Sequence, residues 1–444
     1  MSDMDNLSMT INVKQKKLTV LHVATLNQPI RPDLGYGPIE TIIYNIDKGL
    51  HSLGHRSIVA CSGDSRVSGE HYVTVDQSIG DYWNGDTAQR RKTMKLHLSR
   101  SLGRAKVGDI DVIHMHDAKA IEFIYDSVFS MHIPIVMTLH VSAEDSMLEG
   151  AYQRWCNPLS SALVYCASIS EYQKRQYHDL LNTSNVVYHG IDVKEYPVKK
   201  EPDKGSYLFT IGRITRDKGQ DKAIELAKKT GSKLIIAGCV QNKPADREYF
   251  ASFKNSIDLS VKVGKYPVDN DYYDRVIKPL LCCDKQIIYI GEISSQHKKQ
   301  WYHHARATLF PIQWGEPFGL VPIESMACGT PVIAFNRGAV PEIIVNGKTG
   351  FVVDSMGAMI EAVGFIDNVD PRECRRHVQN HFSLISMAYK YSELYHQIIA
   401  SHKISESRSS LSDDYLSRPN NHATIAMQET HAQRSSSKQR QPSF

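Results

Sequence analysis

The sequence predicts an α/β protein with two doubly wound parallel-sheet domains that face each other. Short apolar stretches typical of buried strands alternate with helical stretches in both halves of the chain. A polar segment at residues 199–205 separates the two halves and is typical of a domain linker. With 444 residues, the chain is long enough to form two domains with separate cores.

The segment boundaries follow from the same patterns. The helical pattern at 383–403 comes after the last expected strand, and the stretch beyond it is rich in Ser, Gln and Arg with little apolar periodicity. In chain order we expect a polar extension (1–16), a first domain (17–198), the linker (199–205), a second domain (206–382), a C-terminal helix (383–403) and a disordered tail (404–444).

Composition narrows the class of protein. A net charge of +4 is too small to indicate a nucleic-acid partner without a local basic patch. The eight cysteines show neither CxxC nor zinc-site spacing, which suits a reducing compartment. The first 17 residues lack the apolar core of a signal peptide, and no apolar run approaches the ~18 residues that span a bilayer. We therefore expect a cytoplasmic protein that needs no metal cofactor.

One strongly basic segment leaves two interpretations open. Residues 89–106 contain seven Lys and Arg residues and no Asp or Glu, while Met94, Leu98 and Leu102 recur at helical spacing. A solvated basic helix explains this pattern, and we favour it. The alternative is that residues 90–106 make a peripheral contact with an anionic membrane on its cytoplasmic face, or hold an anionic acceptor.

The first βα turn does not carry a dinucleotide-binding fingerprint. Gly35 and Gly37 precede Pro38 and an amphipathic helix, but Glu40 stands where a third glycine would be needed. The glycines also lie well beyond the preceding strand rather than at its end. A hydride-transfer enzyme is therefore a weak interpretation.

Two later strands, at 110–116 and 133–140, each end in a histidine. In doubly wound sheets, ligands bind beyond the carboxyl ends of the strands, so His116 and His140 lie where a site is expected. A strand-end histidine can also be a hydrogen-bonded structural residue. We assign that structural role to His114 and His116.

A cationic loop follows the first strand of the second half. The strand at 207–211 leads into Gly212 and Arg213, and Lys218 and Gly219 precede the next helix. Backbone amides at a helix N-terminus favour anions. Arg grips phosphate oxygens with two donors, whereas Lys acts as a compact charge. This loop predicts phosphate binding.

The most informative stretch lies between the strands at 307–310 and 332–335. Pro322 suits a first helical position, and Gly329 suits the residue just past a helix end. The amides that enter this helix could hold an anion, since Gly319 lets a phosphate approach the backbone. Glu316 and Glu324 flank that position. Together they predict a phosphorylated ligand with hydroxyls on both sides, which is a nucleotide sugar.

The string at 316–331 resembles the E-x7-E signature of the family 4 retaining glycosyltransferases, which have the GT-B fold of two Rossmann-like domains. The run at 212–219 matches the G-R-x4-K-G pattern of the same family. The resemblance extends from about residue 17 to about residue 403. In the family, a C-terminal helix such as the one at 383–403 crosses back to the first domain.

The resemblance implies transfer of a sugar, with retention of configuration, from a nucleotide-diphosphate sugar to a glycan, lipid or small-molecule acceptor. Glu324 would accept hydrogen bonds from the ribose and Glu316 from the transferred sugar, while Arg213 and Lys218 would bind the diphosphate. Those cations can replace a divalent metal ion. The donor-binding residues it implies are Glu324, Phe318, Gly319, Leu320, Gly37, Gly35, Arg213, Lys218 and Glu316, and the catalytic residues are Glu316, His140, Arg213 and Lys218.

This sequence departs from the family pattern at two positions. Relatives often have adjacent glycines where Tyr36 separates Gly35 from Gly37, near the donor phosphates or the acceptor. His189 stands before Gly-Ile-Asp, where Asn is common. His140 matches the position that contacts the transferred sugar.

Other functions stay open from the sequence. A nucleotide-sugar epimerase on the same fold would convert the donor without an acceptor. A glycan phosphorylase would need a pyridoxal-phosphate lysine, which no motif marks. A non-catalytic nucleotide-sugar sensor would bind the donor without consuming it.

Overall fold

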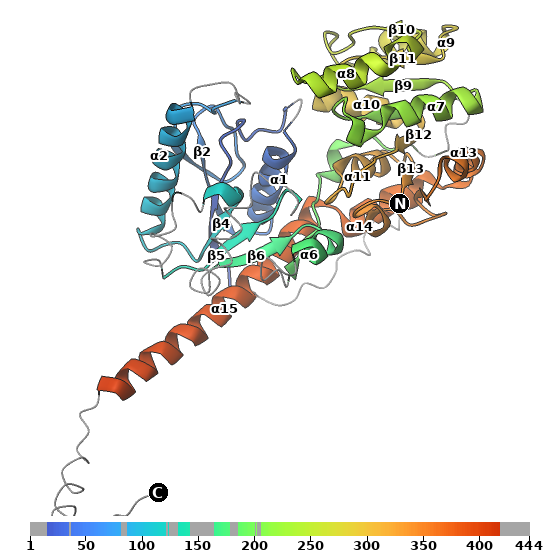
Figure 1. The fold of residues 1–444 in the computed structure, drawn as a ribbon. Helices are drawn as coiled ribbons and strands as arrows, with labels where there is room; N and C mark the ends of the chain where they lie inside the picture. The colour runs from blue at the N-terminus through green and yellow to red at the C-terminus, as the bar shows by residue number, and fades with distance from the viewer. Residues whose placement is uncertain are drawn as a thin grey trace, which may run out of the picture. The chain divides into compact units, whose positions relative to one another are not determined.

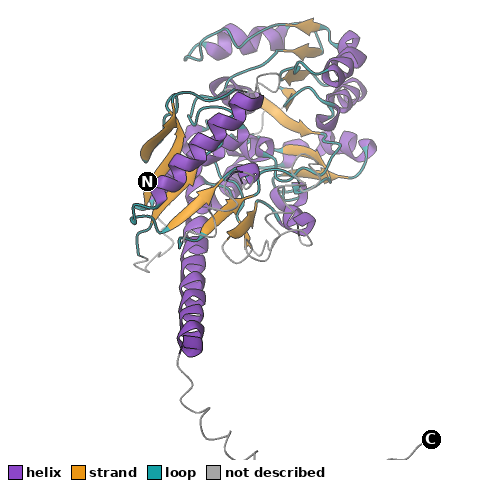
Figure 2. Cartoon of the chain, turned by 60° about the vertical axis from the view of Figure 1, so that its left-hand side comes forward, coloured by secondary structure: helices purple, strands orange, loops and turns teal. Residues whose placement is uncertain are grey.

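The computed structural model describes residues 16–34, 37–80, 87–120, 123, 132–142, 164–177, 185–199, 201 and 206–417 (Figure 1). The chain up to Ile398 forms one compact unit, and the chain from Ile399 onward forms another. Two parallel sheets lie in the first unit, and Figure 2 shows helices packed on the strands of both. The predicted fold class is therefore confirmed.

The first sheet contains seven parallel strands in the order β3-β2-β1-β4-β5-β6-β7. Its strands are β1 (Thr19–Val23), β2 (Arg56–Ser62), β3 (Glu70–Val75), β4 (Val112–Met115), β5 (Ile135–Thr138), β6 (Val164–Ser168) and β7 (Asn185–Val186). The helices described with it are α1 (Pro38–Ser52), α2 (Thr87–Ala105), η1 (Ala118–Ala120) and α6 (Glu171–Tyr177), and η3 (Val193–Glu195) follows in the connection to the second sheet.

The second sheet is also parallel, in the order β10-β11-β9-β8-β12-β13-β14. Its strands are β8 (Tyr207–Ile211), β9 (Leu234–Ala237), β10 (Leu259–Ser260), β11 (Ile287–Tyr289), β12 (Ala305–Phe310), β13 (Val332–Phe335) and β14 (Gly350–Val353). Its longer helices are α7 (Gln220–Thr230), α8 (Pro244–Phe253), α10 (Ser295–His304), α11 (Leu320–Ala327), α13 (Met356–Phe365) and α14 (Pro371–His381). Short turns of helix are η4 (Arg216–Lys218), η5 (Lys254–Ser256), η6 (Tyr273–Ile277), α9 (Lys278–Cys282), α12 (Val340–Ile343) and η7 (Ile366–Asn368), and α15 (Leu384–Ser417) ends the described chain.

The strand order fixes where a ligand site can form. In each sheet the order reverses beside the first strand, between β1 and β4 and between β8 and β12. Loops that leave strands on opposite sides of such a reversal diverge, which opens a crevice at the carboxyl ends. The loops after β8 and β12 carry the cationic run and the two-glutamate motif.

The basic segment forms helix α2, as its helical spacing indicated, and its apolar residues face inward. Met94, Leu98 and Leu102 are all buried. Among the described residues, no helix combines the length and apolarity needed to cross a membrane.

Two local features differ from what the sequence pattern indicates. A glycine after Asn-Gly-Lys-Thr is typical of a turn, but Gly350 begins β14, which pairs with β13. A Cβ on Gly350 would lie 2.0 Å from the Val332 carbonyl oxygen, so close backbone approach explains this glycine. Helix α15 also extends beyond the predicted helix end at residue 403 and continues to Ser417. No Gly or Pro interrupts the chain between Leu384 and Pro419, and elongating an existing helix is easy.

Two segments far apart in sequence pair where the chain passes between the domains. Ile191 forms a parallel bridge with Ser383, with hydrogen bonds from Ile191 N to Phe382 O (2.9 Å) and from Leu384 N to Ile191 O (2.8 Å). A Cβ on Gly190 would lie 2.4 Å from the Ser383 carbonyl oxygen. The two crossings between domains are therefore held together.

The start of α15 packs on the first domain. The Tyr391 hydroxyl lies 2.8 Å from Thr138 Oγ1, and the Tyr395 hydroxyl lies 2.7 Å from His114 Nδ1. Both tyrosines are buried.

Glu342 on α12 connects the second domain to the first. Its carboxylate accepts hydrogen bonds from the backbone N–H groups of Glu171 (2.7 Å) and Tyr172 (2.6 Å) at the start of α6, and from the Tyr188 hydroxyl (3.1 Å). A carboxylate at a helix N-terminus is favoured by both the unpaired amides and the helix dipole. One side chain thus satisfies three donors of the other domain.

We predict that Glu342→Ala lowers the free energy of unfolding by at least about 2 kcal/mol, because it removes three hydrogen bonds to a charged group, and such bonds contribute ~1.5–3 kcal/mol each. Glu342→Gln, which keeps an acceptor but loses the charge, should have a smaller effect. Urea denaturation measures both changes. Glu361→Ala, at an exposed position of α13, is the matched control and should leave stability nearly unchanged. Equal stability of the Glu342→Ala and Glu361→Ala variants would contradict this role.

Candidate functional site

The loops after β8 and β12 meet in an ion pair. Lys218 Nζ lies 2.6 Å from Glu316 Oε2, and Trp314 Nε1 donates to the same oxygen at 2.9 Å. The Lys218 ammonium also lies 5.3 Å from the centre of the Trp314 ring. Both bonds go to Oε2, and Oε1 of Glu316 receives none from the described residues. One carboxylate oxygen is therefore left to accept a bond from a ligand.

The backbone around Glu316 is tightly constrained. Ala339 N donates to the Glu316 carbonyl oxygen at 2.9 Å. Gly338 has a φ of +60°, and a Cβ there would lie 2.2 Å from that carbonyl oxygen. From the first domain, Ser170 Oγ donates to the Pro317 carbonyl oxygen at 2.5 Å. These contacts hold the loop from both sides.

Helix α11 begins at Leu320, two residues before the position that we predicted from Pro322. Gly319 has a φ of +100°, a conformation that other residues rarely adopt, and this turn starts the helix early. Pro322 then stands in the first turn, where a missing N–H leaves no helical hydrogen bond unmade. Phe318, just before the turn, is buried. The amides at 318–320 thus approach the N-terminus of α11, as the sequence suggested.

Arg213 and Lys218 share a loop but have different partners. The Arg213 guanidinium donates to Gln241 Oε1 at 3.4 Å, and the Arg213 carbonyl oxygen accepts from Gln220 Nε2 at 2.9 Å. Arg213 is partly exposed. The structure therefore brings Lys218 to Glu316 and directs Arg213 toward Gln241.

Glu324 is buried and already paired. Its Oε1 lies 2.5 Å from Lys298 Nζ and 3.5 Å from the Tyr196 hydroxyl, and its Oε2 accepts from the Tyr302 hydroxyl at 3.1 Å. Burial and the charge of Glu324 raise the pKa of both tyrosines well above the usual value. The two glutamates of the motif therefore lie in different environments: Glu316 is beside Lys218, and Glu324 is among Tyr196 and side chains of α10.

His140 lies after β5 in a row of histidines. Its Nε2 is 3.1 Å from His116 Nδ1, and its ring stacks on that of His189 with centroids 5.5 Å apart. Burial lowers the pKa of His140 to about 3, so the ring is neutral at physiological pH. His189 in turn contacts Phe318 of the site loop edge-on, at 5.1 Å. The departure from the family pattern at His189 thus lies between His140 and the two-glutamate loop.

The glycines before α1 are described only in part. Gly37 directly precedes the helix, and a Cβ there would lie 2.9 Å from the Leu34 side chain and 3.3 Å from Glu40. Gly35 lies outside the described residues.

Three contributors to this region were not expected from the sequence: Trp314, Lys298 and Glu342. Trp314 stands two residues before Glu316. A side-chain donor so close in sequence to a candidate carboxylate could have been recognised from the sequence. Lys298 and Glu342 reach the site region only through the fold, because their partners are 26 and 171 residues away in sequence.

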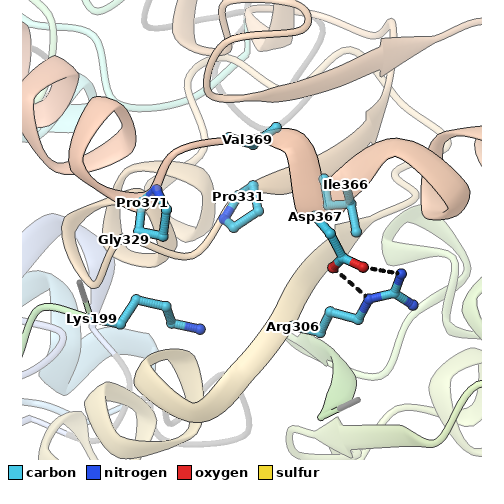
Figure 3. Close-up of a pocket in the computed structure, with 8 residues that line it drawn as sticks. All are labelled: Lys199, Arg306, Gly329, Pro331, Ile366, Asp367, Val369 and Pro371. Carbon is cyan, nitrogen blue, oxygen red and sulfur yellow. Dashed lines mark hydrogen bonds and ion pairs between the residues drawn. The ribbon is translucent and has the colours of Figure 1, made fainter. Parts of the chain in front are cut away.

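A separate pocket is lined in part by Gly329 and Pro331, which follow the C-terminal end of α11 (Figure 3). The polar side chains that line it have structural roles. There Arg306 pairs with Asp367 through two hydrogen bonds of 2.9 Å, and it also donates to the Val363 carbonyl oxygen at 3.1 Å. The Lys199 ammonium donates to the Ala305 carbonyl oxygen at 2.5 Å. These side chains use their polar atoms to join β12 to the elements around it.

Comparison with known proteins decides the family. Residues 193–367 match the family described as glycosyl transferases group 1, and residues 39–195 match Glycosyltransferase Family 4. The chain belongs to the family 4 glycosyltransferases. It is therefore an enzyme of the hexosyltransferase class with the GT-B fold, as the two-glutamate motif predicted.

Individual relatives have low sequence identity to this chain but match most of its length. A phosphatidyl-myo-inositol mannosyltransferase of Mycobacterium tuberculosis is 21% identical over 343 residues, covering 75% of this chain and 83% of the relative. A glycogen synthase of the same species is 26% identical over 365 residues, covering 72% and 79%.

Solved structures share the fold of this glycosyltransferase. Sucrose-phosphate synthase from Thermosynechococcus elongatus superposes with a TM-score of 0.62 at 16% identity, covering 87% of this chain and 100% of that one. HepE from Anabaena, in complex with UDP and glucose, superposes with a TM-score of 0.59 at 16% identity, covering 85% and 99%.

In this glycosyltransferase, Gly338→Ala should lower both stability and activity, because the new methyl group would displace the backbone of Glu316. Gly347→Ala is the matched control: Gly347 also has a positive φ (+74°), but a Cβ there meets no atom within 4 Å. The control should lose about 1 kcal/mol from backbone strain alone, and Gly338→Ala should lose more. Thermal unfolding and turnover measure the two effects. Similar losses in both variants would contradict a role for Gly338 in holding the loop.

Lys298→Met should lower the free energy of unfolding by about 3 kcal/mol, because it leaves the Glu324 carboxylate buried without its cation. Adding Glu324→Gln should recover much of that loss, and the difference measures the coupling. Lys278→Met, at an exposed lysine paired with Asp274, serves as the control and should change stability little. No recovery in the double variant would contradict a dominant Lys298–Glu324 pair.

Proposed function

We propose that this glycosyltransferase moves a sugar from a nucleotide-diphosphate sugar to an acceptor hydroxyl with retention of configuration, without a metal ion. The observation that carries the proposal is the Lys218–Glu316 pair, which joins the two loops flanking the strand reversal of the second sheet. This pair lies beside the turn at Gly319 that starts α11. A cation, a carboxylate and a helix N-terminus meet there, and a sugar diphosphate requires all three.

The diphosphate would be held by positive groups that remain available. An ammonium has three donors, and the bond from Lys218 to Glu316 uses one of them. The Arg213 guanidinium supplies up to five more, of which one is directed to Gln241. With the amides that lead into α11, these groups would stabilise the charge that grows on the leaving phosphate as the glycosidic bond breaks. The same charge would otherwise call for a divalent cation.

The carboxylates and His140 would bind hydroxyls. Glu316 Oε1 accepts no bond from the described residues and would take a hydroxyl of the transferred sugar. Glu324 would bind the ribose through a remaining lone pair, or by exchanging Lys298 for the ligand. His140 would contact the sugar from the first domain, and Gly35 and Gly37 would lie near the donor or the acceptor.

The acceptor is proposed to be a lipid headgroup, reached by peripheral binding to an anionic membrane on its cytoplasmic face. The mannosyltransferase relatives are named for phosphatidyl-myo-inositol. On α2, Arg91, Lys92 and Lys95 are exposed beside Leu96, which is 44% exposed. Arg100 and Arg104 instead bond to the Thr74 carbonyl oxygen and to Asp109, so the first half of the helix carries the contact surface.

Incubation with a panel of nucleotide sugars, followed by slow donor hydrolysis, tests the donor proposal. One donor should be consumed, and Glu316→Ala, Arg213→Ala and Lys218→Ala should each slow its turnover ~10- to 100-fold, because each removes a charged hydrogen bond worth ~1.5–3 kcal/mol in the transition state. Lys222→Ala is the control, since Lys222 is a partly exposed lysine of the neighbouring helix α7.

The products distinguish the alternatives. Release of free sugar and nucleoside diphosphate supports transfer. Conversion of the donor into its epimer would indicate an epimerase, and binding without consumption would indicate a sensor. Unchanged turnover in the three site variants would overturn the assigned site.

A further inference from the structure

A row of three histidines connects the interior of the first sheet to the site. His22 Nδ1 lies 3.3 Å from His116 Nε2, and His116 Nδ1 lies 3.1 Å from His140 Nε2. The three side chains come from neighbouring strands: His22 from β1, His116 from the end of β4, and His140 from the end of β5. His22 and His116 are buried, whereas the His140 ring is partly exposed although its Nδ1 atom is covered.

The three rings are neutral. Burial lowers the pKa of His22 and of His140 to about 3 and lowers that of His116 well below the ordinary value. A neutral imidazole has one donor nitrogen and one acceptor nitrogen. Two neighbouring rings can therefore share a hydrogen bond only if their tautomers match, and the choice at one end of the row fixes the choice at the other.

Two arrangements satisfy both contacts. In one, His22 Nδ1–H donates to His116 Nε2, and His116 Nδ1–H donates to His140 Nε2. The proton of His140 is then on Nδ1. In the other, His140 Nε2–H donates to His116 Nδ1, and His116 Nε2–H donates to His22 Nδ1. The N–H on His22 Nε2 is then unpaired. Neither His22 Nε2 nor His140 Nδ1 has a partner among the described residues. The ends of the row therefore decide between the two arrangements.

An unpaired N–H is costly where no acceptor can reach it. His22 lies inside the sheet with no exposed surface. His140 lies at the strand-end edge, beside His189 and through it the site loop at Phe318, where ligand oxygens are expected. The Nδ1 atom of His140 is itself covered, as Nε2 of His22 is. The outward arrangement nevertheless places the unpaired N–H at the end of the row that lies beside the site loop, and not inside the sheet.

We infer that His22 and His116 are positioning residues that hold His140 as the Nδ1-protonated tautomer, so that it donates a hydrogen bond to an oxygen of the sugar donor. The task of His140 toward the sugar rests on the proposed function, but the tautomer does not. From its sequence, His116 was expected to be structural only; its 3.1 Å contact with His140 now assigns it the orienting of that ring.

A metal site is the competing explanation. Ring nitrogens of His22, His114 and His116 lie within 4.8 Å of one another, a spacing that could hold an ion. Both nitrogens of His114, however, are already hydrogen-bonded, to Thr138 Oγ1 at 2.7 Å and to the Tyr395 hydroxyl at 2.7 Å. Only two imidazoles would remain for zinc, which takes four ligands in structural sites and three protein ligands in catalytic ones.

The test is the 15N chemical shifts of the histidine ring nitrogens in the full chain labelled at histidine, since these shifts separate protonated from unprotonated nitrogens. We expect His140 to be protonated at Nδ1 and unprotonated at Nε2, and His116 and His22 to be protonated at Nδ1. Protonation of His140 at Nε2 would overturn the inference. So would binding of added Zn²⁺ that shifts the signals of His22, His114 and His116 together.

Variants add a functional readout. His116→Phe removes the donor to His140, so the His140 signals should move toward a tautomer mixture and kcat of donor hydrolysis should fall about 10-fold with KM little changed. His116→Gln keeps an amide donor and should restore both. His97→Phe is the matched control: His97 is equally buried but bonds to Thr74 and the Ala24 carbonyl oxygen, outside the row. Unchanged His140 signals in His116→Phe would count against the inference.

The two proposals can fail separately. If the expected tautomers are found but no nucleotide sugar is consumed, the positioning stands and the proposed function fails. If a donor is consumed while His140 is protonated at Nε2, the proposed function stands and the inference fails.

Discussion

The ion pair between Lys218 and Glu316 is the interaction on which the site depends, because it ties together the only two loops that flank the strand reversal in the described part of the second sheet. Each loop alone is a polar turn at a strand end. Joined at 2.6 Å, they place a cation and a carboxylate beside the N-terminus of α11. The pair is partly buried, so its attraction is less screened than that of an exposed salt bridge.

That arrangement persists because both domains support it. Gly338 and Ala339 hold the Glu316 backbone from within the second domain, and Ser170 holds the Pro317 carbonyl from the first. Glu342 adds three hydrogen bonds across the same boundary. The site loop is therefore a point of contact between the domains, and a change in the arrangement of the domains would alter the geometry of this loop.

The first domain presents neutral imidazoles to this loop, whereas the second presents charges. Burial keeps His140 and its neighbours uncharged. Under the proposed function, they would orient hydroxyls without competing with Arg213 and Lys218 for the diphosphate. This division suits a reaction in which negative charge develops on one part of the ligand only.

Much of this protein was determined by its sequence alone. Alternating strand and helix patterns predicted two parallel sheets, because buried parallel strands must be continuously apolar and their crossovers helical. The two-glutamate string and the Gly-Arg loop indicated the family and the neighbourhood of the site, since both follow strands directly. Local patterns also misled in places: Gly350 indicated a turn although it begins a strand, and α15 continues through a stretch without apolar periodicity.

Only the tertiary structure decided which side chains meet. It paired Glu316 with Lys218 and Glu324 with Lys298, brought Glu342 to α6, and aligned three histidines whose positions span 118 residues from His22 to His140. The physical reason is that such contacts depend on the order and register of strands in a sheet. A parallel sheet brings distant strand ends to one edge, and no local pattern in the chain records which ends become neighbours.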